Sequence, residues 1–183
     1  MPNRNNDNWF AYGRGQSIKR FFGGQRLLWP VLSIDSNYVF DEGETVFTGG
    51  GNGPYYGLQL KPDTRESIFY IQAILNHWLM EKLVKSRASS FRGDYYSHGK
   101  QFVATLPIYK IDFENPMEAE VHSIIVQGVQ SLEALVSRRN AAQTKQQRGT
   151  FERAIKVGID RLADSIDSLY GITKEMWVDN EID

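Results

Sequence analysis

The spacing of the apolar residues changes along this chain of 183 residues, and that change restricts the fold more than any other feature. Between residues 26 and 60, short runs rich in β-branched and aromatic side chains alternate with Asp, Asn and Gly, a pattern typical of strands joined by turns. After residue 66, apolar residues recur at three- and four-residue steps, the spacing of one helix face. The sequence therefore predicts an α+β fold with a small, mostly antiparallel sheet.

Within the first predicted strand stands Pro30. Proline cannot donate a hydrogen bond to a neighbouring strand, so this strand is expected at an edge of the sheet or with a bulge. The first predicted helix starts at Asp63 and Glu66 and continues past residue 80, with Gln72 and Glu81 off its buried face.

Two more helices are predicted in the C-terminal part. One begins near Pro116, and the other carries apolar side chains at helical spacing from Phe151 to Leu169. Residues 138–149 between them are polar and of loop character, so the two helices are expected to fold back as an antiparallel hairpin. Gly171 is expected to end the last helix, because glycine readily adopts the left-handed conformation common at helix C-termini.

The net charge of −1 hides a difference between two parts of the chain. Residues 1–110 carry 13 Lys and Arg against 9 Asp and Glu, whereas residues 111–183 carry 8 against 13. Only the first part suits a polyanion such as nucleic acid. The acidic hairpin is expected to avoid a polyanion, and it favours the alternative of a protein-interaction module.

Several kinds of chemistry are excluded or disfavoured by the composition. The chain has no Cys, which excludes disulfides, thiolate nucleophiles and cysteine-bound zinc. No lysine has an acid two residues before it, as a common type of metal-dependent nuclease requires, and no two prolines are adjacent, as in the motif that holds a flipped adenine. The three His residues lack metal-ligand spacing. No catalytic residue, metal or bound cofactor is therefore expected in this chain.

Residues 47–51 (FTGGG) loosely fit the glycine pattern of S-adenosylmethionine sites, but a hairpin tip of residues that tolerate positive φ is the favoured interpretation. No run of about 18 apolar residues appears, and the N-terminus has neither signal-peptide nor transit-peptide character. We therefore expect a cytoplasmic protein that does not enter a membrane.

The segment after the first predicted helix mixes basic and aromatic residues. Such a mixture suits a nucleic-acid backbone with adjacent bases, although an ordinary solvated loop with partly buried tyrosines is an open alternative. A second basic group near the N-terminus could extend the same surface. The candidate DNA-binding residues are Lys85, Arg87, Arg92, Tyr95, Tyr96, His98 and Lys100, together with Arg14, Gln16, Lys19, Arg20 and Arg26.

Four segments in order resemble one known family. They are NWFAYGRGQSI (8–18), the glycine-rich strand region 27–60, the stretch 66–109 with its "ILN" helix, glycine and tyrosine turn and "LPI", and the closing helix with "LYGIT" (159–176). Together they resemble the TaqI-like C-terminal specificity domain of type IIG restriction-modification enzymes and related adenine methyltransferases.

The resemblance implies a target-recognition domain in residues 1–110, followed by the helical hairpin in residues 111–183. It implies binding of double-stranded DNA in a specific sequence, and a partner methyltransferase or nuclease domain or subunit that uses S-adenosylmethionine and Mg. Nothing in this chain matches that catalytic part. The chain is therefore expected to be a fragment, a separate specificity subunit or the remnant of a disrupted restriction-modification gene.

Overall fold

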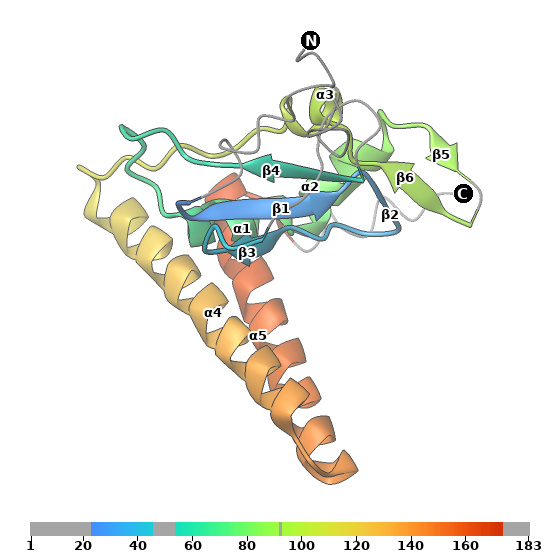
Figure 1. Ribbon diagram of the computed structural model, residues 1–183. Helices are drawn as coiled ribbons and strands as arrows, with labels where there is room; N and C mark the ends of the chain where they lie inside the picture. The colour runs from blue at the N-terminus through green and yellow to red at the C-terminus, as the bar shows by residue number, and fades with distance from the viewer. Residues whose placement is uncertain (1–22, 46–53, 92, 174–183) are drawn as a thin grey trace, which may run out of the picture.

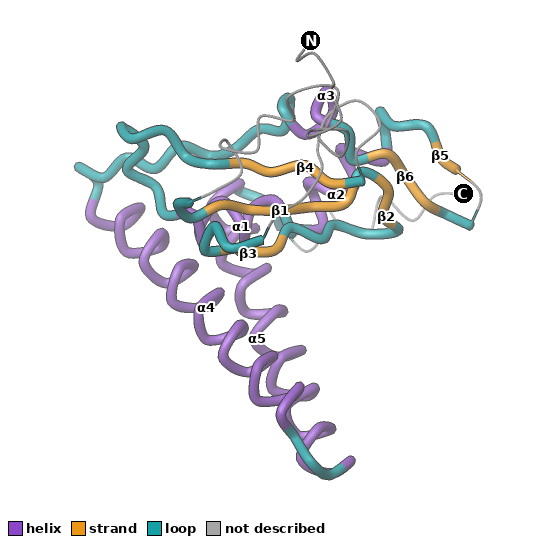
Figure 2. The backbone as a smooth tube through the Cα atoms, viewed as in Figure 1, coloured by secondary structure: helices purple, strands orange, loops and turns teal. Residues whose placement is uncertain are grey.

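The computed structural model describes residues 23–45, 54–91 and 93–173. In this part of the chain, two small sheets and three short helices form a compact body from which two long helices project (Figure 1). Figure 2 shows that the strands and short helices lie together in the body, whereas the projecting part is helical apart from its turn. This arrangement confirms the predicted α+β fold with a C-terminal helical hairpin.

All strands of the described residues pair in antiparallel fashion, but they form two sheets of three strands. The strands are β1 (Arg26–Pro30), β2 (Leu32–Ser33), β3 (Val39–Asp41), β4 (Tyr55–Leu58), β5 (Ser90–Phe91) and β6 (Tyr95–Ser97). The first sheet has the order β3-β1-β4, and the second has the order β2-β6-β5. Because β1 and β2 are nearly continuous in sequence, the chain passes directly from one sheet into the other.

The prediction that Pro30 marks an edge strand is wrong, because β1 is the central strand of its sheet. Pairing with β3 ends at Leu28, however, and only β4 continues beside β1 as far as Pro30. The missing N–H of Pro30 therefore removes no bond to β3. The next residue, Val31, donates to the carbonyl of Pro54 (2.9 Å) and accepts from the backbone N–H of His98 (2.7 Å), which joins the two sheets.

The first predicted helix is two helices, α1 (Ile68–Leu75) and α2 (Trp78–Lys85). The helix break lies at Asn76, whose side chain bonds both backbone groups of Tyr38, accepting from its N–H (2.9 Å) and donating to its carbonyl (2.8 Å). His77 then begins α2, and its ring nitrogen Nδ1 accepts from the backbone N–H of Leu79 (3.4 Å).

Helix α1 also begins later than predicted, since Ser67 and not Asp63 is its N-cap residue. Seven of its eight residues are buried, because strands β1 and β3 and the projecting helix α4 pack against it. Gln72 and Glu81 are both buried, which contradicts their predicted position off the buried face. A helix covered on several sides has no single apolar stripe from which buried positions can be predicted.

The long helices are α4 (Pro116–Ala141) and α5 (Lys145–Tyr170), and they confirm the predicted antiparallel hairpin. The polar segment 138–149 is mostly helical rather than a loop. Only three residues join the helices, because Thr144 and Gln147 form a reciprocal capping box that starts α5 immediately. Gly171 ends α5 with φ of +65°, as predicted.

One hydrophobic core connects the body with the near end of the hairpin. Leu27 of β1, Ile74 of α1 and Met80 of α2 belong to it, and so do Ile125 of α4 and Ile166 of α5. The hairpin base is therefore packed on the body, and the domain division near residue 110 stays a prediction.

We predict that Ile166→Ala lowers the free energy of unfolding by about 2 to 5 kcal/mol, because truncation of a side chain that is 1% exposed leaves a cavity in the shared core. The matched control is Ile159→Ala in the same helix. Ile159 is 53% exposed, so this control should change stability by less than about 1 kcal/mol. Urea unfolding followed by circular dichroism measures both, and equal losses would contradict the described packing.

We also predict that stability falls as the pH decreases from about 6.5 toward 4. Burial lowers the pKa of His77 from 6.5 to about 4. A hydrogen bond with the backbone of Ala163 raises this pKa, but by less than burial lowers it. The unfolded chain therefore takes up this proton first, and about 2 kcal/mol of stability is lost between pH 7 and pH 5. Asp167 Oδ1 lies 3.3 Å from His77 Nε2 and also accepts a hydrogen bond from Trp78 Nε1. The pKa of His77 stays lowered despite this neighbouring carboxylate.

His77→Asn provides the matched variant, because asparagine can cap α2 but does not titrate in this range. Urea unfolding at pH 7 and pH 5 should show a clearly smaller loss for this variant than for the wild type. The same pH dependence in both proteins would show that another group is responsible.

Candidate nucleic-acid interface

The segment predicted as a basic and aromatic loop folds mainly as a β-hairpin, β5–β6, between α2 and the short helix α3 (Lys100–Val103). Its turn places Gly93 and Asp94 in the left-handed region, with φ of +80° and +61°. Glycine adopts this conformation without a steric penalty, and aspartate is one of the few other residues that tolerate it. The aromatic and hydroxyl side chains of the segment are therefore presented from strands.

A buried carboxylate, Glu81 of α2, holds this β-hairpin to the body. Its Oε2 accepts from Ser36 Oγ (2.6 Å) and lies 2.8 Å from His98 Nε2, while its Oε1 lies 3.2 Å from Lys85 Nζ. Lys85 also pairs with Asp35 (3.1 Å). We call Asp35, Ser36, Glu81, Lys85 and His98 the Glu81 network.

Both charged groups at the centre of the Glu81 network favour their ionised forms. Burial alone would raise the pKa of Glu81, but the hydrogen bonds from His98, Ser36 and Lys85 lower it further than burial raises it. Burial alone would lower the pKa of Lys85, but Asp35 and Glu81 raise it above its usual value. The network therefore places fixed charges directly beneath the β-hairpin.

His98 belongs to this network and is 1% exposed, so its prediction as a DNA-contacting residue is corrected. Its Nδ1 lies 3.2 Å from the carbonyl oxygen of Tyr96, and its own carbonyl accepts from Trp29 Nε1 (2.9 Å). Contacts on both ring nitrogens and on the backbone fix the end of β6. His98 therefore positions Tyr96 and does not lie on the surface.

Arg26 is likewise corrected, because its side chain is 2% exposed. Its Nε pairs with Asp41 Oδ2 (2.7 Å) and its Nη2 donates to the carbonyl of Thr45. This ion pair ties the start of β1 to the end of β3. Arg26 is a structural residue of the first sheet.

The other predicted DNA-binding residues fall into three groups: exposed residues, half-buried residues and residues outside the described part of the chain. Arg87, Tyr95 and Lys100 are exposed, and Arg87 also donates to Thr105 Oγ1 (2.9 Å). Lys85 and Tyr96 are half-buried, with Lys85 Nζ 5.4 Å from the centre of the Tyr96 ring. Five others lie outside the described residues, namely Arg14, Gln16, Lys19, Arg20 and Arg92.

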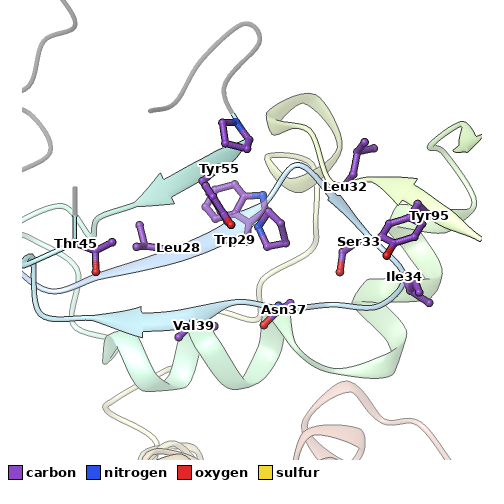
Figure 3. Close-up of a pocket in the computed structure, with 12 residues that line it drawn as sticks. Leu28, Trp29, Leu32, Ser33, Ile34, Asn37, Val39, Thr45, Tyr55 and Tyr95 are labelled. Carbon is purple, nitrogen blue, oxygen red and sulfur yellow. The ribbon is translucent and has the colours of Figure 1, made fainter. Parts of the chain in front are cut away.

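The open face of the two sheets forms a groove of about 910 Å³ (Figure 3). Among the described residues that line it, none is charged, and Ser33, Asn37 and Thr45 are the polar ones with Tyr55 and Tyr95. Its apolar side chains come from β1, β2 and β3, from a residue after β2 and from the residue before β4: Leu28, Trp29, Pro30, Leu32, Ile34, Val39 and Pro54.

Exposed apolar side chains are concentrated around this groove. Leu32, Ile34, Val39, Tyr55 and Tyr95 are each more than 40% exposed, and Phe91 of the neighbouring strand is 50% exposed. Contiguous exposed apolar surface of this kind marks interaction sites in soluble proteins. We call this surface, with the β5–β6 hairpin at its end, the open sheet face.

The open sheet face was not predicted from the sequence, although a signal was present. In β1, Leu27 and Trp29 are buried, and the alternate set consists of the buried Arg26 followed by the apolar Leu28 and Pro30, which line the groove. An antiparallel sheet with one solvated face normally alternates apolar and polar residues. The apolar residues at positions 28 and 30, where polar side chains are usual, were the available indication of a second contact surface.

The residues that the structure describes contain no group of three or more His, Asp or Glu side chains placed to hold a metal ion. None of their helices combines the length and apolar character needed to cross a membrane. The glycine pattern at residues 47–51 lies outside the described residues.

Comparison with known proteins relates this chain to restriction-modification enzymes. A type II restriction enzyme and methyltransferase of Escherichia coli, RM.Eco57I, is 29% identical to it over 171 residues. The match covers 92% of this chain but only 17% of that protein. No family model matches the chain.

We predict that Glu81→Gln destabilises the protein by about 3 kcal/mol, because it removes the buried carboxylate that pairs with Lys85 and contacts Ser36 and His98. The matched control is Glu114→Gln, which removes an exposed ion pair with Arg65 and should cost less than about 1 kcal/mol. Chemical unfolding measures both variants. Hydrogen exchange should become faster at Tyr95–Ser97 in the first variant, and unchanged exchange there would contradict the anchoring role of the network.

Proposed function

We propose that this chain is the DNA target-recognition part of a restriction-modification enzyme of the adenine-methylating type. The observation that carries the proposal is the similarity to RM.Eco57I along nearly the whole chain. The open sheet face adds physical support, because its β-hairpin carries exposed aromatic side chains and is flanked in sequence by the exposed cations Arg87 and Lys100. A two-stranded β-ribbon is one of the structures that fit the major groove of B-DNA.

In this proposal, phosphate contacts and base contacts come from different residues. Arg87 and Lys100 contact phosphates and fix the register of the protein on the duplex. Tyr95 and neighbouring polar side chains such as Ser33 contact base edges, where sequence can be distinguished. The apolar side chains of the groove suit sugars and thymine methyl groups.

The proposed role is non-catalytic. Methyl transfer and cleavage would belong to a partner domain or subunit, which would bind S-adenosylmethionine and Mg, and the proposed place of action is the cytoplasm. This view agrees with the lack of a flipped-adenine motif and of an acid two residues before any lysine. The alternatives are a protein-interaction module and the remnant of a disrupted gene.

Selection from duplexes with a randomised stretch tests the proposal for any target sequence. The purified chain should enrich one sequence pattern, and binding should weaken steeply with rising salt because counterions are released from the phosphates. An interaction module or an inactive remnant would enrich no pattern.

We predict that Tyr95→Ala weakens binding to the enriched sequence by about 1 to 3 kcal/mol and leaves binding to scrambled duplexes nearly unchanged. Arg87→Ala should instead weaken binding to all duplexes alike and reduce the salt slope by about one unit. Titrations on both duplexes at two salt concentrations separate these effects. If neither variant changes binding, the open sheet face is not the DNA-reading surface.

A further inference from the structure

The acidic character of the C-terminal part conceals a basic segment at the tip of the helical hairpin. Residues 137–156 contain six Lys and Arg side chains against one acid, Glu152. Residues 111–136, which lead away from the body, contain five acids and no Lys or Arg. The six tip cations are Arg138, Arg139, Lys145, Arg148, Arg153 and Lys156.

These cations are available to a ligand. Five of the six are exposed, and Arg139 is half-buried. None takes part in any ion pair within the part of the chain that the structure describes. Arg139 and Arg153 bond only neutral groups, the side chains of Asn140 and Thr150. Their charge is therefore not neutralised by the fold.

Arg138 and Arg139 stand in the last turn of α4, where cations stabilise a helix, but the position of Lys145 and Arg148 is not explained by helix stability. Lys145 and Arg148 stand in the first turns of α5, and no acid is present in its first turn. The positive end of the helix dipole lies there, so acids would stabilise this turn and cations oppose it. Two cations are therefore kept where they disfavour the helix.

The tip also lies well away from the body (Figure 1). Val129 is the last residue of α4 that is buried, and α4 continues for 12 residues beyond it to Ala141. At 1.5 Å per residue, this part of the helix projects by roughly 18 Å. The tip can therefore contact a partner separately from the open sheet face.

We propose that the hairpin tip binds the phosphate backbone of double-stranded DNA. This inference rests on the proposed function and adds a second, sequence-independent contact to it. Because the tip lies roughly 18 Å beyond the last buried residue of α4, the phosphates that it contacts in this proposal are separate from those facing the β5–β6 hairpin.

The chemistry of the tip favours DNA over an anionic membrane surface. Residues 140–150 contain no Trp, Phe, Leu or Ile that could enter a lipid layer, as interfacial helices require. They contain Asn140, Gln143, Gln146 and Gln147, and amide side chains commonly donate to phosphate and sugar oxygens.

The test compares two double variants of the full chain that each remove two exposed positive charges. Lys145→Gln with Arg148→Gln changes the tip, whereas Lys61→Gln with Lys110→Gln changes exposed lysines of the body. Binding to a mixed-sequence duplex and to the duplex enriched by selection is measured at several salt concentrations. Thermal melting confirms that both variants are folded.

The tip variant should lose affinity for both duplexes alike, by roughly eightfold for each charge at about 0.1 M salt, and its salt slope should fall by about two units. The control variant should bind like the wild type. Unchanged affinity and an unchanged salt slope in the tip variant would overturn the tip contact. The recognition function would still stand in that case if the wild type prefers the enriched duplex.

Other outcomes overturn the proposal in distinct ways. If the wild-type chain binds no duplex at all, both the tip contact and the recognition function fail. A third outcome is that the wild type binds phosphatidylserine vesicles more tightly than DNA, and that only the tip variant loses this vesicle binding. The tip would then be a membrane contact instead.

Discussion

The carboxylate of Glu81 is the group on which the arrangement of the second sheet depends. That sheet consists of three very short strands, and a sheet of this size is not stable without packing against other elements. Glu81 connects helix α2 to His98 at the end of β6 and to Ser36 beyond β2. A buried carboxylate without these partners would carry a large desolvation penalty, so the charge specifies one position for the second sheet.

This internal arrangement determines what remains outside. Once His98 and Lys85 turn inward to Glu81, the outer side of the second sheet carries aromatic and apolar side chains such as Tyr95 and Leu32. The continuation of β1 into β2 then places the open sides of both sheets around one groove. The Glu81 network thus contacts the second sheet from its inner side, and a surface that is already held in place loses less conformational entropy on binding.

Sequence patterns predicted the antiparallel strands from short β-branched and aromatic runs between turn residues, and the helical hairpin from its regular apolar period. They missed the break between α1 and α2, because Asn76 ends α1 through backbone groups of Tyr38, which lies 38 positions earlier in the chain. They also assigned Arg26 and His98 to the surface, since residue type alone does not show that Asp41 and Glu81 lie beside them in the fold. The groove was missed because its lining combines residues from both sheets.

The net charge of residues 111–183 did not reveal the basic tip, because a sum over a long segment does not show how the fold distributes its charges. Helices α4 and α5 run antiparallel, so residues near the turn gather at one end while residues far apart in sequence gather at the other. The acids of residues 111–136 therefore lie toward the body and the tip cations at the far end, although residues 111–183 as a whole carry 8 Lys and Arg against 13 Asp and Glu. In the proposed arrangement, an uncharged groove distinguishes sequences and a distant cationic tip contributes affinity for any duplex. Because the two surfaces share no residues, changes in the groove can alter the recognised sequence without removing the electrostatic part of binding.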